Sequence, residues 1–119
     1  MAEARGGCGL EKFVKGEVVV IPFPFSDLTQ AKRRPALILT ELEGDDLILC
    51  QITSQAIKDK YAIPISDDDF EVGGLKKPSN IRPNRIFTAD THLVLYRTGK
   101  LKVVKLNEII DRVIEIVRQ

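Results

Sequence analysis

Apolar residues occur in short runs along most of the chain and recur at helical spacing only near its C-terminal end. Short runs rich in β-branched residues and bounded by glycine, proline or polar clusters are typical of buried strands. Such runs predict strands at residues 17–21, 36–40, 47–54, 61–65, 85–88 and 93–97. The run at 47–54 is almost continuously apolar, which favours a strand covered on both faces, as in a small closed barrel. Pro64 favours an edge position for the strand at 61–65, because proline removes a backbone donor.

The end of the chain is predicted to form a helix at about residues 103–118. Apolar side chains separated by three or four residues form one stripe there, namely Val103, Leu106, Ile110, Val113 and Val117. Strands that precede a terminal helix indicate a mainly β, α+β architecture, built as a small barrel of antiparallel strands.

A basic cluster, Lys32, Arg33 and Arg34, ends the proline-rich segment at residues 22–35, which is predicted to be a long loop. The planar guanidinium group matches the geometry of phosphate, so this cluster is a candidate anion site. A solvated cationic turn is the alternative interpretation.

Two further segments carry polar side chains suited to nucleic acid. Thr53, Ser54 and Gln55 follow the third predicted strand, where they either orient a phosphate or ribose hydroxyl or simply stabilise a turn. Arg82 and Arg85 flank two amides and precede Phe87, and cations interleaved with an aromatic ring suit single-stranded nucleic acid. A core position is the alternative for Phe87.

Composition narrows the function classes. The 119 residues fit one domain, and 44% apolar residues suffice for a packed core. Lys and Arg total 18 against 17 Asp and Glu, a formal charge of +1, which excludes a globally cationic nucleic-acid binder but allows a local basic groove.

No metal or other cofactor is expected. Cys8, Cys50 and the lone His92 show no metal-ligand spacing. No apolar stretch approaches the ~18 residues of a membrane span, and no apolar signal segment precedes the domain. We therefore expect a cytoplasmic protein without membrane contacts, with a flexible glycine-rich tail at residues 1–12 and a folded domain at 13–119.

Six segments, in this order, resemble the MazF/PemK-type toxins of type II toxin–antitoxin systems. They are KGEVVV at 15–20, PFPF at 22–25, RPALIL at 34–39, ITSQ at 52–55, RIFTAD at 85–90 and TGKL at 98–101. The resemblance covers about residues 13–118 and implies an SH3-like small barrel with a C-terminal helix. It further implies a homodimer, a cognate antitoxin protein as partner, and metal-independent endoribonuclease activity on single-stranded RNA at short sequences. Its arginine and threonine motifs place active-site residues at Arg34 and Thr53.

Metal-free RNA cleavage uses the adjacent 2′-hydroxyl as nucleophile and leaves a 2′,3′-cyclic phosphate and a 5′-hydroxyl. Arg34 is suited to stabilise the charge that develops on the phosphate, while Thr53 orients it. A guanidinium is a poor general base, so the group that takes the proton stays open. The predicted RNA contacts are Lys32, Arg33, Ser54, Gln55, Arg82, Arg85 and Phe87.

One segment departs from the family pattern. Many members carry Gln-Ile-Arg-Thr-x-Asp, whereas this chain has Arg85 at the glutamine position and Phe87 at the arginine position. We hypothesise that Arg85 supplies the missing charge and that Phe87 stacks on a base. Three alternatives remain: a non-catalytic toxin of the same fold that binds a protein such as DNA gyrase, an attenuated RNA-binding member, and a plain SH3-like interaction domain. The last fits the fold but does not account for Arg34 and Thr53.

Overall fold

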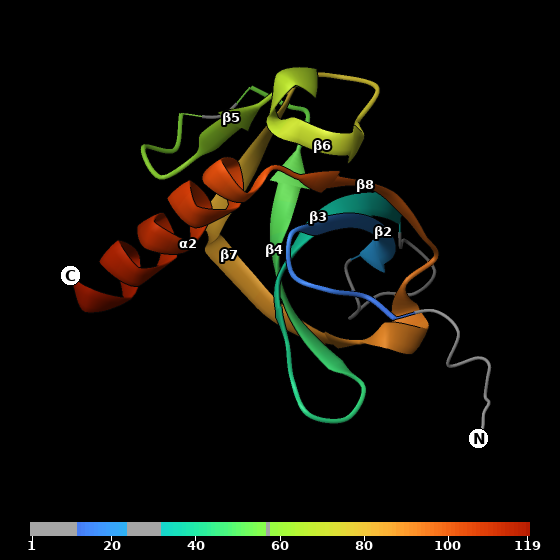
Figure 1. Ribbon diagram of the computed structural model, residues 1–119. Helices are drawn as coiled ribbons and strands as arrows, with labels where there is room; N and C mark the ends of the chain where they lie inside the picture. Colours follow the sequence, from blue (N-terminus) through green and yellow to red (C-terminus); the bar gives the residue numbers. More distant parts are fainter. Residues whose placement is uncertain (1–11, 24–31, 57) are drawn as a thin grey trace.

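A curled antiparallel sheet forms most of the protein, and a helix packs against one side of it (Figure 1). The computed structural model describes residues 12–23, 32–56 and 58–119. Its strands are β2 (Glu17–Phe23), β3 (Lys32–Glu41), β4 (Asp46–Thr53), β5 (Ile63–Ile65), β6 (Phe70–Gly73), β7 (Ser79–Asp90) and β8 (Tyr96–Leu101). They pair in the order β5-β7-β4-β3-β2-β8-β6, with every neighbouring pair antiparallel. The predicted mainly β fold with a C-terminal helix is confirmed, as a half-barrel.

The strands β2 and β3 extend further than predicted. β2 continues through Pro22 to Phe23, and β3 begins at Lys32, so the basic cluster lies within a strand and not in a loop. Pro22 pairs with Arg33, and Pro35 pairs with Val20. Each proline removes only one donor, and the residues on either side keep the two strands paired. The remaining part of the predicted loop, residues 24–31, and residues 1–11 of the predicted tail lie outside the described residues.

The second half of the chain departs more from prediction. The strand predicted at 85–88 is part of the longer β7, which carries a bulge: Cys50 pairs with Ile86 and Gln51 with Arg82, so residues 83–85 have no counterpart on β4. The acidic turn after β5 contains the short helix η1 (Asp67–Asp69), and β6 follows it directly, a strand that the sequence did not predict. β8 begins at Tyr96, not at residue 93, because Asp90 caps the short helix η2 (Thr91–Leu93).

The sheet is covered on both faces, as the apolar run in β4 predicted. Neighbouring residues of β2 belong to different core clusters, Val18 to one and Val19 to the other. The first cluster includes Leu106 and Ile109 of the helix α2 (Val103–Arg118), whose bounds match the prediction. The predicted stripe is wrong at its ends, where Val103 and Val117 are 63% and 73% exposed. No described helix is long and apolar enough to cross a membrane.

β5 lies at the edge of the sheet, as the proline in its middle predicted. This arrangement leaves the ends of β2, β3 and β4 and the bulge of β7 close together, because β3 pairs with β2 and β4, and β4 pairs with β7. The candidate site lies at this end of the sheet.

Candidate functional site

A cavity of about 330 Å³ opens between β2, β3, β4 and β7. It brings together six residues that the sequence singled out: Arg34, Thr53, Gln55, Arg82, Arg85 and Phe87. The other described residues of its lining are Ile21, Phe23, Pro35, Ala36, Gln51 and Ile52. The six predicted residues, up to 53 positions apart in the chain, thus converge on one cavity by strand pairing.

Arg34 is held by β3, with its backbone paired to Ile21 of β2. Its side chain is exposed, and it forms no hydrogen bond or ion pair with any residue in the described part of the chain. Because the strand fixes the backbone while the guanidinium keeps its donors, Arg34 is able to offer two parallel hydrogen bonds to a phosphate.

Thr53 ends β4, where it both stabilises a turn and lines the cavity. Its Oγ1 accepts the backbone N–H of Gln55 at 3.1 Å, which stabilises the turn, and the residue also lines the cavity. A hydroxyl that accepts from the backbone still has its own hydrogen to donate. Thr53 is therefore able to donate a hydrogen bond to a bound phosphate.

The bulge of β7 positions two further arginines. Arg82 precedes it, and its Nη2 lies 3.3 Å from Oδ2 of Asp59 in the loop after β4. The backbone N–H of Tyr61 donates to Asp59 at 2.8 Å and, together with the side chains of Asn84 and Arg82, holds the pKa of that carboxyl below its usual range. Arg82 is thus oriented by a charged partner, whereas exposed Arg85, at the end of the bulge, forms no ion pair with a described residue.

Two aromatic rings form one wall. Phe87 is half-buried, and it both packs against the second core cluster and lines the cavity. The ring of Phe23 lies 5.4 Å from it, centroid to centroid. Phe23, which was predicted to lie in a loop, and Gln51 were not among the predicted site residues. The signal for Gln51 was present: it interrupts an apolar run two residues before Thr53, which places both side chains on one face of β4.

The described lining of the cavity carries three arginines and no carboxylate, histidine, lysine or tyrosine. A chain of nearly balanced charge therefore has a local basic site, as anticipated. The same lining lacks the carboxylate ligands that Mg²⁺ prefers.

A sequence model of the family described as "PemK-like, MazF-like toxin of type II toxin-antitoxin system" matches residues 14–117. The chain belongs to this family. No curated protein matches the sequence.

Solved structures with the fold of this MazF-like toxin include MazF from Deinococcus radiodurans, with a TM-score of 0.71 and 17% identity over 92% of this chain and 99% of that chain. A MazE–MazF complex from the same organism gives a TM-score of 0.69 and 16% identity over 90% and 96% of the two chains. An endoribonuclease in complex with its cognate antitoxin from a Mycobacterial species gives 0.70 and 12% over 89% and 95%. At identities this low, the structural similarity establishes the fold alone.

Three predicted contacts of the MazF-like toxin lie outside this cavity. Arg33 of β3 and Ser54, which directly follows β4, line a second cavity on the other side of these two strands. Lys32 is exposed and is not among the described lining of either cavity.

His92 lies in a different cluster. Its Nδ1 is 2.6 Å from Oδ1 of Asp90, and the side chain of Asp45 brings a third potential ligand atom, all within 4.8 Å of one another. The pairing of Asp46 with Asp90 assembles this group, which sequence spacing did not predict. All three side chains are exposed, and such groups are common without a metal.

Proposed function

We propose that this MazF-like toxin is a metal-independent endoribonuclease that cleaves single-stranded RNA at short sequences. The observation that carries the proposal is the convergence of Arg34 and Thr53 on one basic cavity whose described lining has no carboxylate. A phosphodiester is attracted to such a site, and a divalent cation is not.

The reaction assigned to this cavity is an internal transfer. The 2′-hydroxyl oxygen attacks the adjacent phosphorus, and the bond from phosphorus to the 5′-oxygen breaks. The 2′-hydroxyl loses a proton and the leaving 5′-oxygen gains one, so the products are a 2′,3′-cyclic phosphate and a 5′-hydroxyl. Arg34 donates to the non-bridging oxygens as their negative charge increases, and Thr53 holds one of them in place.

The arginines act by charge and not by proton transfer. A guanidinium is a poor general base, so Arg34, Arg82 and Arg85 are assigned electrostatic roles. Preorganised donors in a partly enclosed site are sufficient to supply several kcal/mol, about 2.7–4 for one donor aimed at a developing oxyanion. The identity of the base stays open.

Recognition of the RNA is assigned to the rest of the lining. Phe87 offers a ring on which a base can stack, beside Phe23, and Gln51 and Gln55 offer amides to base edges. Arg85 lines the same cavity as Phe87, which supports the hypothesis that it supplies charge in place of the arginine that other members carry.

The assembly of the toxin is also a proposal. We expect a homodimer that buries about 1,200–2,000 Å² and a cognate antitoxin that blocks the basic cavity. The Deinococcus and Mycobacterial complexes with antitoxin support an antitoxin partner by shared fold. Light scattering that shows a monomer at micromolar concentration would contradict the first.

Incubation of the purified protein with a long single-stranded RNA tests the proposed function. Discrete fragments are expected from the wild type and from Arg118→Ala, which removes an exposed arginine far along α2, and much slower fragmentation from Arg34→Ala. Intact RNA with all three proteins contradicts the proposal. Intact RNA together with inhibited supercoiling by DNA gyrase would instead indicate a non-catalytic toxin.

A further inference from the structure

A second cavity, of about 570 Å³, lies next to the candidate site and on the other side of β3 and β4. Its described lining includes Arg33, Ser54, Lys76, Lys77, Tyr96 and Arg97, and no carboxylate. We propose that this second cavity binds the RNA strand that flanks the cleaved bond, so that the substrate passes from one face of the sheet to the other. This inference rests on the proposed function and adds a binding site for the part of the RNA that flanks the cleaved bond.

The two cavities are lined by residues that are neighbours in the sequence. Arg33 and Arg34 are neighbours at the start of β3, Thr53 and Ser54 are neighbours at the end of β4, and in each pair one residue lines each cavity. Pro35 lines both. An RNA chain held by Arg34 and Thr53 therefore reaches Arg33 and Ser54 by crossing the ends of β3 and β4, a path of a few nucleotides.

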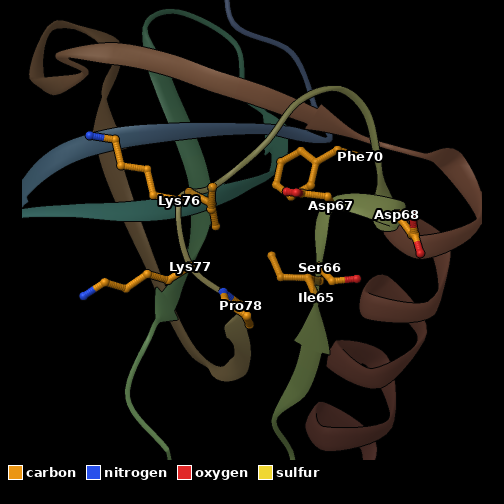
Figure 2. Close-up of a pocket in the computed structure, with 9 residues that line it drawn as sticks. Ile65, Ser66, Asp67, Asp68, Phe70, Lys76, Lys77 and Pro78 are labelled. Carbon is orange, nitrogen blue, oxygen red and sulfur yellow. The ribbon is translucent and has the colours of Figure 1, made fainter.

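The cations of the second cavity are available to a ligand. Arg33, Lys76 and Lys77 are exposed, and none of them forms an ion pair with a residue that the structure describes. A smaller cavity lies between the two lysines and the acidic turn, and Figure 2 shows that both lysine side chains extend away from Asp67 and Asp68. Among the described residues, Arg97 alone of these cations has an ion-pair partner, Glu17 at 2.7 Å.

The lysines are presented by a well-anchored loop. The Oγ of buried Ser79 donates to the carbonyl of Lys77 at 2.9 Å, and the N–H of Gly74 donates to the carbonyl of Thr98 at 3.1 Å. Gly73 has a φ of +67°, and a Cβ there would lie 2.2 Å from the carbonyl oxygen of Thr98. The chain therefore approaches β8 closely only because residue 73 is a glycine.

The composition of the cavity favours RNA as its occupant. Tyr96 is 49% exposed and offers a ring for stacking, and Ser54 is an exposed hydroxyl beside the cations. Cations that follow a backbone, with aromatic rings between them, are the usual means of holding a single strand. An acidic peptide is the competing occupant, and the experiment separates the two.

The test compares two RNA lengths. Once the cleaved sequence is known, two fluorescent oligonucleotides are made with a 2′-deoxy nucleotide at the cleaved bond, one of about four nucleotides and one of about twelve. Binding is measured for the wild type, for Lys76→Glu/Lys77→Glu, and for Lys15→Glu/Arg118→Glu, which reverses two exposed charges that line neither cavity. Thermal unfolding of each variant confirms that the fold is intact.

We expect Lys76→Glu/Lys77→Glu to bind the long RNA about tenfold more weakly than the control variant and the short RNA equally well. The salt dependence of long-RNA binding should become shallower by about 1.4, or about 0.7 for each lost phosphate contact. Equal affinity of both variants for the long RNA would overturn the inference, as would weaker capture of the antitoxin with unchanged RNA binding, which would mark a peptide site. If the wild type binds neither length, the proposed function itself fails, and this inference with it.

Discussion

The rings of Phe23 and Phe87 lie 5.4 Å apart, centroid to centroid, with an interplanar angle of 50°. Phe23 ends β2, and Phe87 lies on β7, opposite Leu49 of β4. The pair packs against the core on one side and lines the basic cavity on the other. The core thus holds both rings in place at the wall of the basic cavity.

Substitutions at Phe87 should separate its two roles. Phe87→Leu keeps apolar volume and should cost less than about 1.5 kcal/mol of unfolding free energy, whereas Phe87→Ala should cost more. Both should weaken RNA binding, by about 1–3 kcal/mol if one base stacks on the ring. Urea unfolding and RNA titration measure the two effects.

Arg85→Ala is the companion variant, because it removes charge from the same cavity without touching the core. We expect weaker RNA binding at unchanged stability. If Phe87→Ala lowers stability by about 3–5 kcal/mol while Arg85→Ala binds RNA normally, Phe87 is only a core residue and the stacking hypothesis is wrong.

Arg34→Ala should remove a charge-stabilising donor and little else. The expected loss in the cleavage barrier is about 2–4 kcal/mol, or about 30- to 1,000-fold in rate. Stability should stay within about 0.5 kcal/mol, because the side chain is exposed. Single-turnover cleavage by Arg34→Ala and by Arg118→Ala gives the comparison, and a rate within about threefold of wild type would refute the assignment of Arg34.

Thr53→Val and Thr53→Ser form a matched pair. Valine keeps the shape but removes the hydroxyl that accepts from Gln55 and faces the cavity, and serine keeps that hydroxyl. Cleavage should fall about 10- to 150-fold in Thr53→Val, the scale of one hydrogen bond to a charged group, and recover in Thr53→Ser. Equal rates for the two variants would show that the hydroxyl takes no part.

Most strands could be predicted from the sequence because short runs of β-branched apolar residues are typical of buried strands. The basic cluster was predicted to lie in a loop because two prolines precede it and a third follows it directly. Its pairing with β2 makes it part of a strand. The bulge at residues 83–85 depends on the register between β4 and β7, which no local signal carries. The same holds for Arg82 and Asp59, which meet across 23 positions of sequence.

Asp59 should make stability depend on pH. Its hydrogen bonds with Tyr61, Asn84 and Arg82 lower the pKa in the folded state, so the ionised form is the stabilised one. Its contribution is complete above the unfolded value of about 3.9 and is lost as pH falls through the lower folded pKa. Asp59→Asn should be less stable than wild type at pH 7, with a gap in urea midpoint that closes in acid. A gap that does not narrow as the pH falls would contradict this expectation.

Cys50 should be inert in the native protein. Burial raises the pKa of its thiol to about 12, so almost none is thiolate at pH 8. In a Cys8→Ser background, a thiol reagent at pH 8 should modify Cys50 only after unfolding in urea. Prompt modification of the folded protein would show that this part of the core opens readily.

The central claim is that the Arg34–Thr53 cavity cleaves RNA through its 2′-hydroxyl and without a metal. The most direct measurement follows one RNA oligonucleotide in excess EDTA beside a copy with a single 2′-deoxy nucleotide at the cleaved bond. We expect the unmodified RNA to be cut to a 2′,3′-cyclic phosphate and a 5′-hydroxyl. We expect the deoxy-substituted copy to be bound but to stay intact. Cleavage of the deoxy-substituted copy, or cleavage that EDTA abolishes, would contradict the central claim.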